Sequence, residues 1–379
     1  SSVKNLLYYQ QNTTFGLTER YLFDLARSVD RSKYNVHVMF PDVPEMWQFE
    51  SLSSLDIRLH RTSEVFLASN TLRSVPHMLP ILRQIHPDLI HFNDPVLAGL
   101  VAGQLHRYAS LVMTHHTPEL DRGYSWKGRL LEKIAFRKRP FVIFTSENDL
   151  HTGVVRDGFR EDNCTVVPYG IDVASFSRHS CRRSILQELG IPSEHRIIGN
   201  VARLVPQKGH EYLIAAAKIV LSQCDDVSFL VVGSGSLIDE LSSKVEHEGI
   251  SQRFVFTGQR SDVPLVLSAC DLFVLPSLFE GLCMAVLEAF AAGVPVVATK
   301  VGGVPSTVVE GETGALVPPG DVEALAEAII WMLGNPELAR KMGLRGKRRV
   351  EKRFTIDAMI KRTEAVYELL LSRRKNQMG

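Results

Sequence analysis

Short apolar runs alternate with longer amphipathic stretches along almost the whole chain. Most of the short runs are continuous, as in strands of a parallel sheet that is covered on both faces. Thirteen runs predict strands, at residues 5–9, 35–40, 57–60, 89–92, 111–115, 141–145 and 165–167, then 197–202, 228–232, 254–256, 272–275, 294–298 and 315–317. Helical patterns such as 16–28, 210–222 and 322–333 lie between them. This repeated β–α alternation predicts an α/β fold with parallel sheets.

The β–α pattern restarts after Tyr169-Gly170-Ile171-Asp172, and the polar segment 178–183 is typical of a connector. A length of 379 residues suits two domains of ordinary size, so we place the boundary near residue 172. Nine of the thirteen histidines precede this boundary, whereas the glycine-bearing strand–loop–helix turns concentrate after it. Because such domains bind ligands at the carboxyl ends of their strands, we expect a phosphate-binding second half opposite a histidine-bearing first half.

Composition narrows the class of protein. Hydrophobic residues make up 45% of the chain and charged residues 22%, as in a globular protein with real cores. A net charge of +1 offers no electrostatic case for nucleic-acid binding. Five scattered cysteines without a Cys-x-x-Cys pair fit a reducing compartment and exclude a standard zinc site. With no apolar run of about 18 residues and no signal peptide at the start, the expected location is the cytoplasm.

The stretch 272–289 predicts a strand, a short turn and the start of a helix after Gly281. Glu280 stands at the entry and Glu288 inside the helix. If both lay on one helix, eight residues would separate them by about 12 Å, whereas glycosidase carboxylate pairs need about 5 to 9.5 Å. We therefore expect an extended ligand held at both ends, with a phosphate over the helix start. The alternative is a buried strand–helix unit whose Glu280 only favours the helix dipole.

Three strand–loop–helix turns of the second half suit anions: 199–209, 232–236 and 299–305. Arg203 offers forked donors for phosphate oxygens, and Lys208 offers a mobile point charge. Two solvated surface cations are the alternative. The turn at Gly233 lacks the full Gly-x-Gly-x-x-Gly spacing, so a dinucleotide site is not favoured. Three such turns with two cations predict a phosphorylated ligand.

The second half carries an ordered series of motifs: Arg203…Lys208-Gly209, Gly233-x-Gly235, Val255-Phe256-Thr257-Gly258, Pro276-Ser277…Glu280-Gly281…Glu288-Ala289, Gly293-Val294-Pro295-Val296-Val297-Ala298-Thr299 and Gly302-Gly303-Val304-Pro305. The first half adds Thr114-His115-His116-Thr117 and Pro168-Tyr169-Gly170-Ile171-Asp172. This order resembles the retaining glycosyltransferases of family 4 over nearly the whole chain. The resemblance implies the GT-B fold, in which two Rossmann-like domains with parallel sheets face each other across a cleft. It implies an acceptor domain over 1–172, completed by a C-terminal helix at about 355–379, and a nucleotide-sugar donor domain over 173–354.

Carried over residue by residue, the resemblance assigns Arg203 and Lys208 to the donor diphosphate. Glu280 would hydrogen-bond the hydroxyls of the donor sugar, and Glu288 those of the ribose. The backbone of 258–260 would read the nucleobase, and the N–H groups of 282–284 would meet sugar or phosphate. The implied donor-binding residues are Gly16, Arg203, Lys208, Gly233, Gly258, Gln259, Arg260, Glu280, Gly281, Leu282, Cys283, Met284 and Glu288. The implied catalytic residues are His116, Glu280, Arg203 and Lys208.

His116 would lie near the donor sugar, with His115 the second choice, whereas packed or capping imidazoles are the alternative for both. Three positions depart from the family pattern. A single glycine, Gly16, precedes the first helix where two are usual, so close approach of that backbone to a ligand is less secure. Ser306 replaces a usual Glu, and Cys283 stands where Gly is common.

The chemistry implied is hexosyl transfer from a nucleoside-diphosphate sugar, with no cofactor and no metal ion, since no Asp-x-Asp motif is present. The acceptor would be a carbohydrate, a lipid-linked or a small molecule. The alternatives are a nucleotide-sugar epimerase on the same fold and a non-catalytic nucleotide-sugar-binding subunit. A dehydrogenase fits the glycine turns least.

The segment 122–139 carries seven Lys and Arg residues against one Glu, interleaved with apolar side chains. A basic amphipathic helix of this kind can lie on an anionic membrane surface, here the inner face of the cytoplasmic membrane. The alternative is a core-packed helix with a solvated cationic face. The later cluster 345–353 is interpreted as a solvated helical face.

Overall fold

The computed structural model describes residues 3–12, 16–62, 75–93, 102–103, 109–116, 140–156, 158–176 and 182–378. The chain divides into two compact units: unit 1 comprises residues 1–170 and 356–379, and unit 2 comprises residues 171–355. The basic segment 122–139 lies outside the described residues. Within the described part of the chain, no helix is both long enough and apolar enough to cross a membrane.

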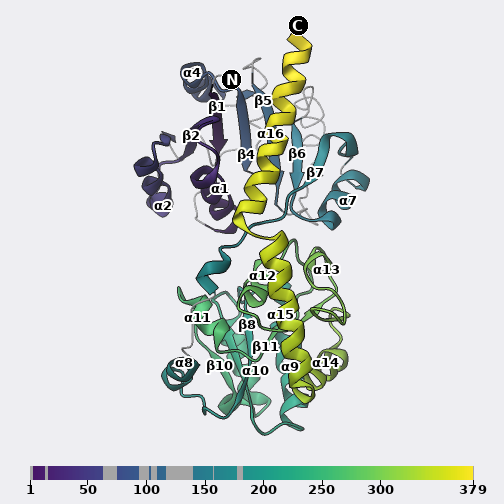
Figure 1. Cartoon of the computed structure of the whole chain (residues 1–379). Helices are drawn as coiled ribbons and strands as arrows, with labels where there is room; N and C mark the ends of the chain where they lie inside the picture. The colour runs from purple at the N-terminus through teal and green to yellow at the C-terminus, as the bar shows by residue number, and fades with distance from the viewer. Residues whose placement is uncertain are drawn as a thin grey trace. The chain divides into compact units, whose positions relative to one another are not determined.

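Unit 1 contains a seven-stranded parallel sheet in the order β3-β2-β1-β4-β5-β6-β7 (Figure 1). Its strands are β1 (Lys4–Tyr9), β2 (Tyr34–Pro41), β3 (Arg58–Thr62), β4 (Leu89–Asn93), β5 (Ser110–His115), β6 (Phe141–Phe144) and β7 (Cys164–Val166). Its helices are α1 (Leu17–Ser28), α2 (Trp47–Glu50), α4 (Val75–Ile85), α7 (Glu147–Val155) and α16 (Ile356–Met378).

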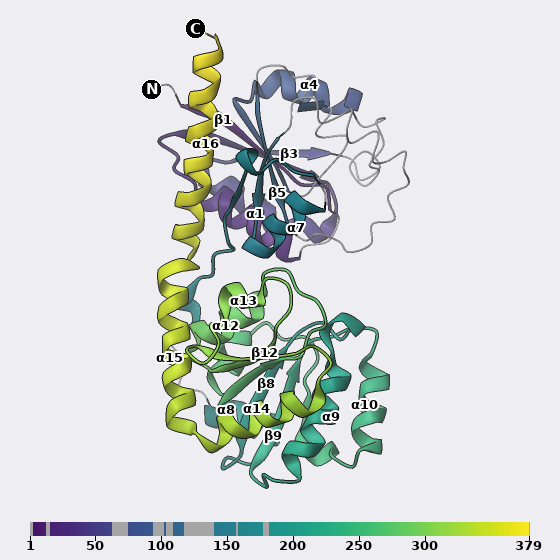
Figure 2. The same ribbon diagram turned by 90° about the vertical axis from the view of Figure 1, so that its right-hand side faces the viewer.

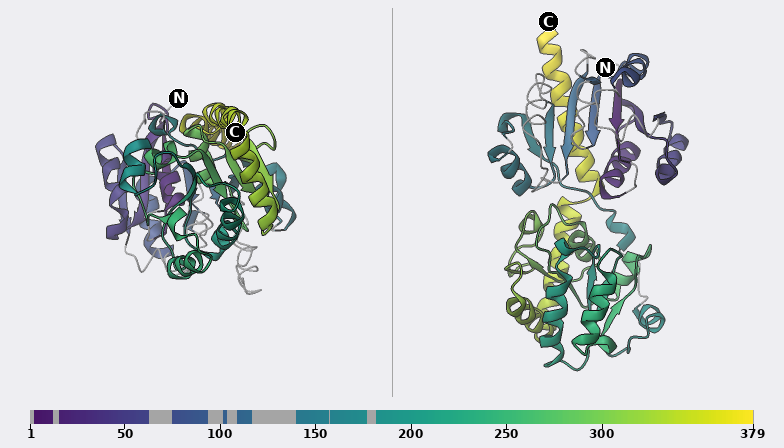
Figure 3. Two further views of the ribbon diagram at one scale, coloured as in Figure 1. Left: turned by 90° about the horizontal axis from the view of Figure 1, so that it is seen from below. Right: turned by 180° about the vertical axis from the view of Figure 1, so that it is seen from behind.

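Successive side chains of β1 and β4 point to opposite faces of this sheet. Tyr9 and Phe92 belong to an apolar cluster that includes side chains of α4. Tyr8 and His91 point the other way, toward the Tyr367 hydroxyl on α16. The C-terminal helix therefore covers one face of the unit 1 sheet, as the view from behind in Figure 3 shows. It spans Ile356–Met378, and the resemblance implies a C-terminal helix at about 355–379.

Unit 2 contains a six-stranded parallel sheet in the order β10-β9-β8-β11-β12-β13. Its strands are β8 (Arg196–Val201), β9 (Val227–Val232), β10 (Phe254–Phe256), β11 (Leu272–Leu275), β12 (Val296–Thr299) and β13 (Gly314–Val317). Its helices are α8 (Arg182–Glu188), α9 (His210–Leu221), α10 (Ile238–His247), α11 (Val263–Ser268), α12 (Met284–Ala291), α13 (Val304–Thr307), α14 (Val322–Gly334) and α15 (Pro336–Arg353). Figure 2 shows α9, α10 and α14 on one side of this sheet and α8, α12 and α15 on the other.

All thirteen predicted strands are present, and their ends differ from the prediction by two residues at most. Both strand orders are those of a doubly wound Rossmann-like sheet. The predicted α/β class with two Rossmann-like domains is confirmed. The continuous apolar runs have their physical reason in this arrangement, because β9 and β11 are buried along their whole length between two helical layers.

Candidate functional site

The strand order of unit 2 reverses between β8 and β11. The chain passes from β8 outward to β9 and β10, then crosses to β11 and continues outward through β12 and β13. In open α/β sheets, ligands bind at the carboxyl ends of the two strands that flank such a reversal. Residues 202–209 after β8 and residues 276–283 after β11 are the loops at this position.

Direct hydrogen bonds join these two loops. The Leu278 N–H donates to the Gln207 carbonyl at 2.9 Å, and the Gln207 side-chain amide donates to the Phe279 carbonyl at 2.9 Å. Gly209 has φ of +64° and packs so closely that a Cβ atom there would lie 2.1 Å from the Pro276 carbonyl oxygen. Glycine is therefore required at the start of α9 for loop packing as well as for its dihedral angles.

Lys208 and Glu280 form an ion pair across the reversal point, with 2.5 Å between Nζ and Oε1. The Ser277 hydroxyl donates to the same carboxylate oxygen at 2.6 Å. Only 15% of the Lys208 side chain and 6% of the Glu280 side chain are accessible. A carboxylate with so little access to water needs partners of this kind. Two residues assigned to different parts of the donor are thus in direct contact with each other.

The end of β12 and the loop after it hold the backbone of the Ser277–Glu280 turn from the other side. The Thr299 hydroxyl donates to the Ser277 carbonyl at 2.5 Å, and the Gly303 N–H donates to the Glu280 carbonyl at 3.4 Å. Gly302 has φ of +49°, and a Cβ atom there would lie 1.6 Å from the Glu280 carbonyl oxygen. Any side chain at Gly302 would displace Glu280.

Gly233 plays a similar part on the β9 side. A Cβ atom at Gly233 would lie 1.9 Å from the Ala202 carbonyl oxygen, and one at Gly235 would lie 2.3 Å from that of Leu204. The Gly233 N–H donates to the Gly258 carbonyl at 2.9 Å. These glycines let neighbouring loops touch, so their conformational freedom already has a structural use within the protein itself.

Helix α12 begins at Met284 with Cys283 as its N-cap, and no side chain caps it. Glu280 therefore lies in the turn before the helix. Glu280 and Glu288 are not on one helix, so the separation of about 12 Å calculated for that case does not apply to them. The uncapped first turn presents the positive end of the helix dipole beside the Lys208–Glu280 pair. Leu282 and Cys283 are buried, and Gly281, Met284 and Glu288 are half-buried. Burial raises the pKa of the Cys283 thiol to about 12.

The remaining residues predicted to bind the donor differ in whether their side chains already have partners within the protein. Arg203 is exposed, and its guanidinium has no hydrogen-bond or ion-pair partner among the described residues. Gln259 is exposed beside Gly258. Arg260, in contrast, pairs through its guanidinium with Asp262 at 2.7 Å and with Glu188 of α8 at 2.7 Å. The Arg260 side chain thus links the loop after β10 to α8. The predicted contact of Arg260 with the nucleobase is through its backbone and stays a prediction.

In unit 1, His116 follows β5 and is buried. Its Nδ1 and Nε2 atoms lie 2.6 Å from the Tyr169 hydroxyl and 2.5 Å from Asn93 Oδ1. Burial lowers the pKa of His116 to about 3, so the imidazole is neutral at physiological pH. His115 is half-buried against the rings of Phe144 and Phe159.

Gly16, the single glycine before the first helix, donates its N–H to Glu19 Oε2 at 2.8 Å. That N–H is therefore occupied by the protein itself. The sequence interpretation did not single out Glu19, nor Gln10 and Asn93, which lie buried near it. For Gln10 and Asn93 the available signal was their place at the ends of apolar runs, because carboxyl ends of parallel strands meet at one edge of a sheet.

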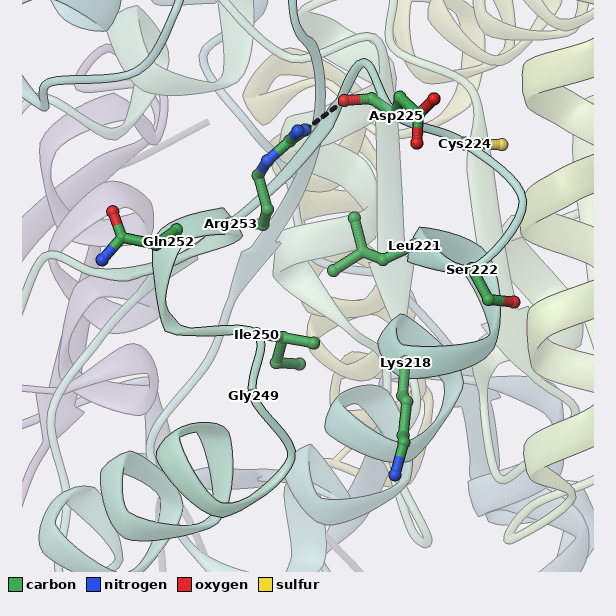
Figure 4. A pocket seen from close by; sticks show the side chains of 9 residues that line it. All are labelled: Lys218, Leu221, Ser222, Cys224, Asp225, Gly249, Ile250, Gln252 and Arg253. Atoms are coloured by element: carbon green, nitrogen blue, oxygen red, sulfur yellow. Dashed lines mark hydrogen bonds between the residues drawn. The ribbon is translucent and has the colours of Figure 1, made fainter.

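A surface pocket of about 270 Å³ lies at the opposite edge of the unit 2 sheet (Figure 4). It is lined by residues that precede β9 and β10, including Asp225 and Arg253. Its cations are already paired, Lys218 with Glu248 at 2.7 Å and Arg253 with the Asp225 carbonyl. This pocket brings together none of the predicted site residues. In the described part of the chain, no three His, Cys, Asp or Glu side chains are grouped so that they could hold a metal ion.

Known families and proteins resemble both halves of the chain. The family model for Glycosyltransferase Family 4 matches residues 18–175, and that for Glycosyl transferases group 1 matches residues 182–349. The chain is 27% identical over 358 residues to the capsular polysaccharide biosynthesis glycosyltransferase CapM of Staphylococcus aureus, covering 90% of this chain and 91% of CapM. It is 31% identical over 302 residues to the alpha-maltose-1-phosphate synthase of Mycolicibacterium smegmatis, covering 72% of this chain and 76% of that protein.

Among solved structures, HepE of Anabaena in complex with UDP and glucose superposes with a TM-score of 0.82. The match covers 96% of this chain and 99% of HepE, at 23% sequence identity. At this identity the similarity establishes the shared fold of the two chains.

Proposed function

This chain belongs to the glycosyltransferases of the GT-B fold, and we propose that it transfers a sugar from a nucleoside-diphosphate sugar to an acceptor hydroxyl. We further propose that the transfer retains the configuration at the sugar and needs no metal ion or cofactor. The observation that carries the proposal is the buried Lys208–Glu280 pair beside the uncapped start of α12, at the strand reversal of unit 2. The match of both halves to glycosyltransferase families does not favour an epimerase.

The diphosphate is the part of the donor that this edge of the sheet suits best. Arg203 is exposed and unoccupied by any described residue, Lys208 is close by in the same loop, and the first turn of α12 has no side-chain cap. All three favour an anion, with Lys208 sharing its charge between Glu280 and the phosphate, and we propose that together they take the place of a divalent cation. Glu280 would then accept hydrogen bonds from the donor sugar, and Glu288, one helical turn into α12, from the ribose.

Transfer would break the bond between C1 of the sugar and the phosphate oxygen, with the electron pair remaining on the diphosphate. Arg203, Lys208 and the start of α12 would stabilise the negative charge that develops there. The acceptor oxygen would bond to C1 on the face that the phosphate leaves, and its proton would pass to the departing phosphate oxygen. No covalent intermediate with the protein is assigned. His116 would lie near the sugar, and it would bond a sugar hydroxyl only by exchanging its contact with Asn93 or Tyr169. An imidazole of such low pKa is a weak base, so we assign it no proton transfer.

The relatives suggest the substrates to try first. HepE has been crystallised with UDP and glucose, and CapM is a glycosyltransferase of capsular polysaccharide biosynthesis. UDP-glucose is therefore the first donor to test, and a carbohydrate, lipid-linked carbohydrate or small molecule is the proposed acceptor. We place the enzyme in the cytoplasm, with peripheral contact to anionic lipid through residues 122–139. Co-sedimentation with anionic vesicles that stays at background would contradict that contact.

A donor panel followed by product analysis tests the proposal. We expect one nucleotide-sugar to raise the melting temperature and to yield a glycosylated acceptor with the donor's anomeric configuration. The Glu280→Ala variant should lose at least about 100-fold in kcat/KM, the loss typical of a group that acts in the transition state. Glu211→Ala, at an exposed position on α9, is the matched control and should keep wild-type activity. Wild-type kcat/KM in Glu280→Ala, or sugar isomerisation without acceptor, would refute the proposal.

A further inference from the structure

Glu19 is a buried carboxylate in the first turn of α1, with 2% of its surface exposed. Three side-chain groups donate to its Oε1 atom: Gln10 Nε2 at 2.6 Å, Asn12 Nδ2 at 2.7 Å and Thr18 Oγ1 at 2.7 Å. The Gly16 N–H donates to Oε2 at 2.8 Å. Four donors around one carboxylate satisfy its charge without any cation. Nothing in the proposed transfer uses this group.

The hydrogen bonds that start at Glu19 have a fixed direction. A carboxylate only accepts, so the Gln10 side chain must present its NH₂ group to Glu19 and its oxygen to the next neighbour. That neighbour is Asn93, whose Nδ2 donates to Gln10 Oε1 at 2.7 Å. The same Nδ2 donates to the Thr18 carbonyl at 2.8 Å, which is a second acceptor-only group. Both contacts turn Asn93 Oδ1 toward His116.

His116 Nε2 lies 2.5 Å from Asn93 Oδ1, so this nitrogen carries the hydrogen. The neutral ring then has a lone pair on Nδ1, which accepts from the Tyr169 hydroxyl at 2.6 Å. The ring stacks on Tyr169, with 5.6 Å between centroids and 8° between planes, and meets the edge of Tyr21 at 4.9 Å. Its tautomer and its orientation are therefore both determined by neighbours.

We propose that Glu19 is a positioning residue, whose buried carboxylate holds His116 in the Nε2–H tautomer through Gln10 and Asn93. The carboxylate also holds Gly16 and Thr18, so one charge organises both the start of α1 and the residue after β5. The effect of Glu19 on transfer rests on the proposed function, whereas its effect on the His116 tautomer does not. Glu19 has no role of its own in the proposed transfer, and it would act through the residues that it orients.

Glu19→Gln is the most informative substitution, because it keeps the shape and removes the charge. One of the two carboxylate oxygens becomes an NH₂ group, and every hydrogen-bond neighbour of both oxygens among the described residues is a donor. At least one of the four hydrogen bonds must break, and the remaining ones lose the charge of their acceptor, so Gln10 is held less firmly. The Asn93 amide can then turn its NH₂ group toward His116, which favours the Nδ1–H tautomer.

Nitrogen NMR of histidine-labelled protein measures this directly. The His116 resonances are assigned by their loss in His116→Asn. We expect Nε2–H in the wild type and in Glu45→Gln, a control that removes an exposed carboxylate of unit 1, and a population of Nδ1–H in Glu19→Gln. Wild-type protein with Nδ1–H, or with a His116 ring that titrates near pH 6.5, would overturn the proposal.

Kinetics with the best donor give the second measurement. The loss of one charge-assisted hydrogen-bond network should lower kcat about 10- to 100-fold in Glu19→Gln. The Kd for UDP should stay within about threefold, because the proposed diphosphate groups lie in unit 2. If Glu19→Gln does not fold, Gln10→Leu is the second variant. It removes the hydrogen bonds between Gln10 and both Glu19 and Asn93, and it should also lower kcat. Unchanged kcat together with an unchanged tautomer would overturn the proposal. An inactive wild type with Nε2–H would contradict the proposed function alone.

Discussion

The Lys208–Glu280 pair allows a quantitative test of how the site is held together. At 2.5 Å, two unit charges attract each other by about 7 kcal/mol at an effective dielectric constant of about 20. Removal of both charges from water opposes most of this attraction. Lys208→Met keeps the apolar stem and leaves the Glu280 charge buried, with the Ser277 hydroxyl as its remaining side-chain donor among the described residues. Loss of one partner from a buried pair typically costs about 3–5 kcal/mol. We expect about 3 kcal/mol, because part of the Lys208 side chain is accessible and Ser277 stays bonded.

The double variant Lys208→Met/Glu280→Gln removes both charges and should regain at least about 2 kcal/mol of that loss. The assay is urea unfolding of the four proteins in a double-mutant cycle. It is followed by the fluorescence of Trp331, on α14 of unit 2, in a background with Trp47→Phe and Trp126→Phe. A separate reporter is needed because two compact units need not unfold in a single transition.

Lys218→Met is the matched control for this cycle. Lys218 also pairs with a glutamate of unit 2, Glu248 at 2.7 Å, but its side chain is 62% exposed. Its removal should change the unfolding midpoint little, because exposed ion pairs contribute little. If Lys208→Met and Lys218→Met lower the stability equally, or if the double variant recovers nothing, the ion pair is not what holds the Glu280 turn in place.

Two further predictions concern a glycine and the buried histidines. Gly302→Ala should lower the stability of unit 2 by about 2 kcal/mol or more, since its Cβ would meet the Glu280 carbonyl. Gly311→Ala is the control, because Gly311 has φ of +69° but open space around it, so only the cost of the left-handed backbone conformation remains. Thermal unfolding of the two variants measures the difference. His91 and His116 each have a folded-state pKa lowered by burial to about 3, below the unfolded value near 6.5. The unfolded chain therefore binds these protons first, so stability falls as the pH drops from about 6.5 toward 3, by about 2 kcal/mol per histidine at pH 5. An unfolding midpoint in urea that is the same at pH 7 and pH 5 would contradict this reasoning.

The strands and the loops after them were predictable because their signals are local. Continuous apolar runs such as 272–275 fit a sheet covered on both faces, and the Glu280 turn follows directly from such a run. Sequence could also place Arg203 and Lys208 after β8, at the carboxyl edge of the sheet. The start of α12 was harder to place. Cys283 is not a usual N-cap residue, and the helix begins at Met284 rather than directly after Gly281.

Contacts between residues distant in the chain could not be predicted. Lys208 and Glu280 are 72 residues apart, and their ion pair exists only because β8 and β11 become neighbours. Gly302 was predicted as part of an anion-binding turn, yet its closest constraint is the Glu280 backbone. Glu19 carried no signal beyond an acidic residue in the first turn of a helix, because its partner Gln10 follows β1 and the next residue of the network, Asn93, ends β4.

The central claim is that the loops after β8 and β11 bind the diphosphate of the donor. Isothermal titration of the protein with UDP, and with GDP and ADP as alternatives, tests it most directly. Arg203 is the best residue to change, because its guanidinium has no partner among the described residues and its loss should leave the fold intact. We predict that Arg203→Ala weakens the binding of the preferred nucleotide about tenfold or more. Arg345→Ala, an exposed arginine on α15, should bind as the wild type does. Equal affinity of Arg203→Ala and the wild type, or no binding of any of the three nucleotides, would contradict the account.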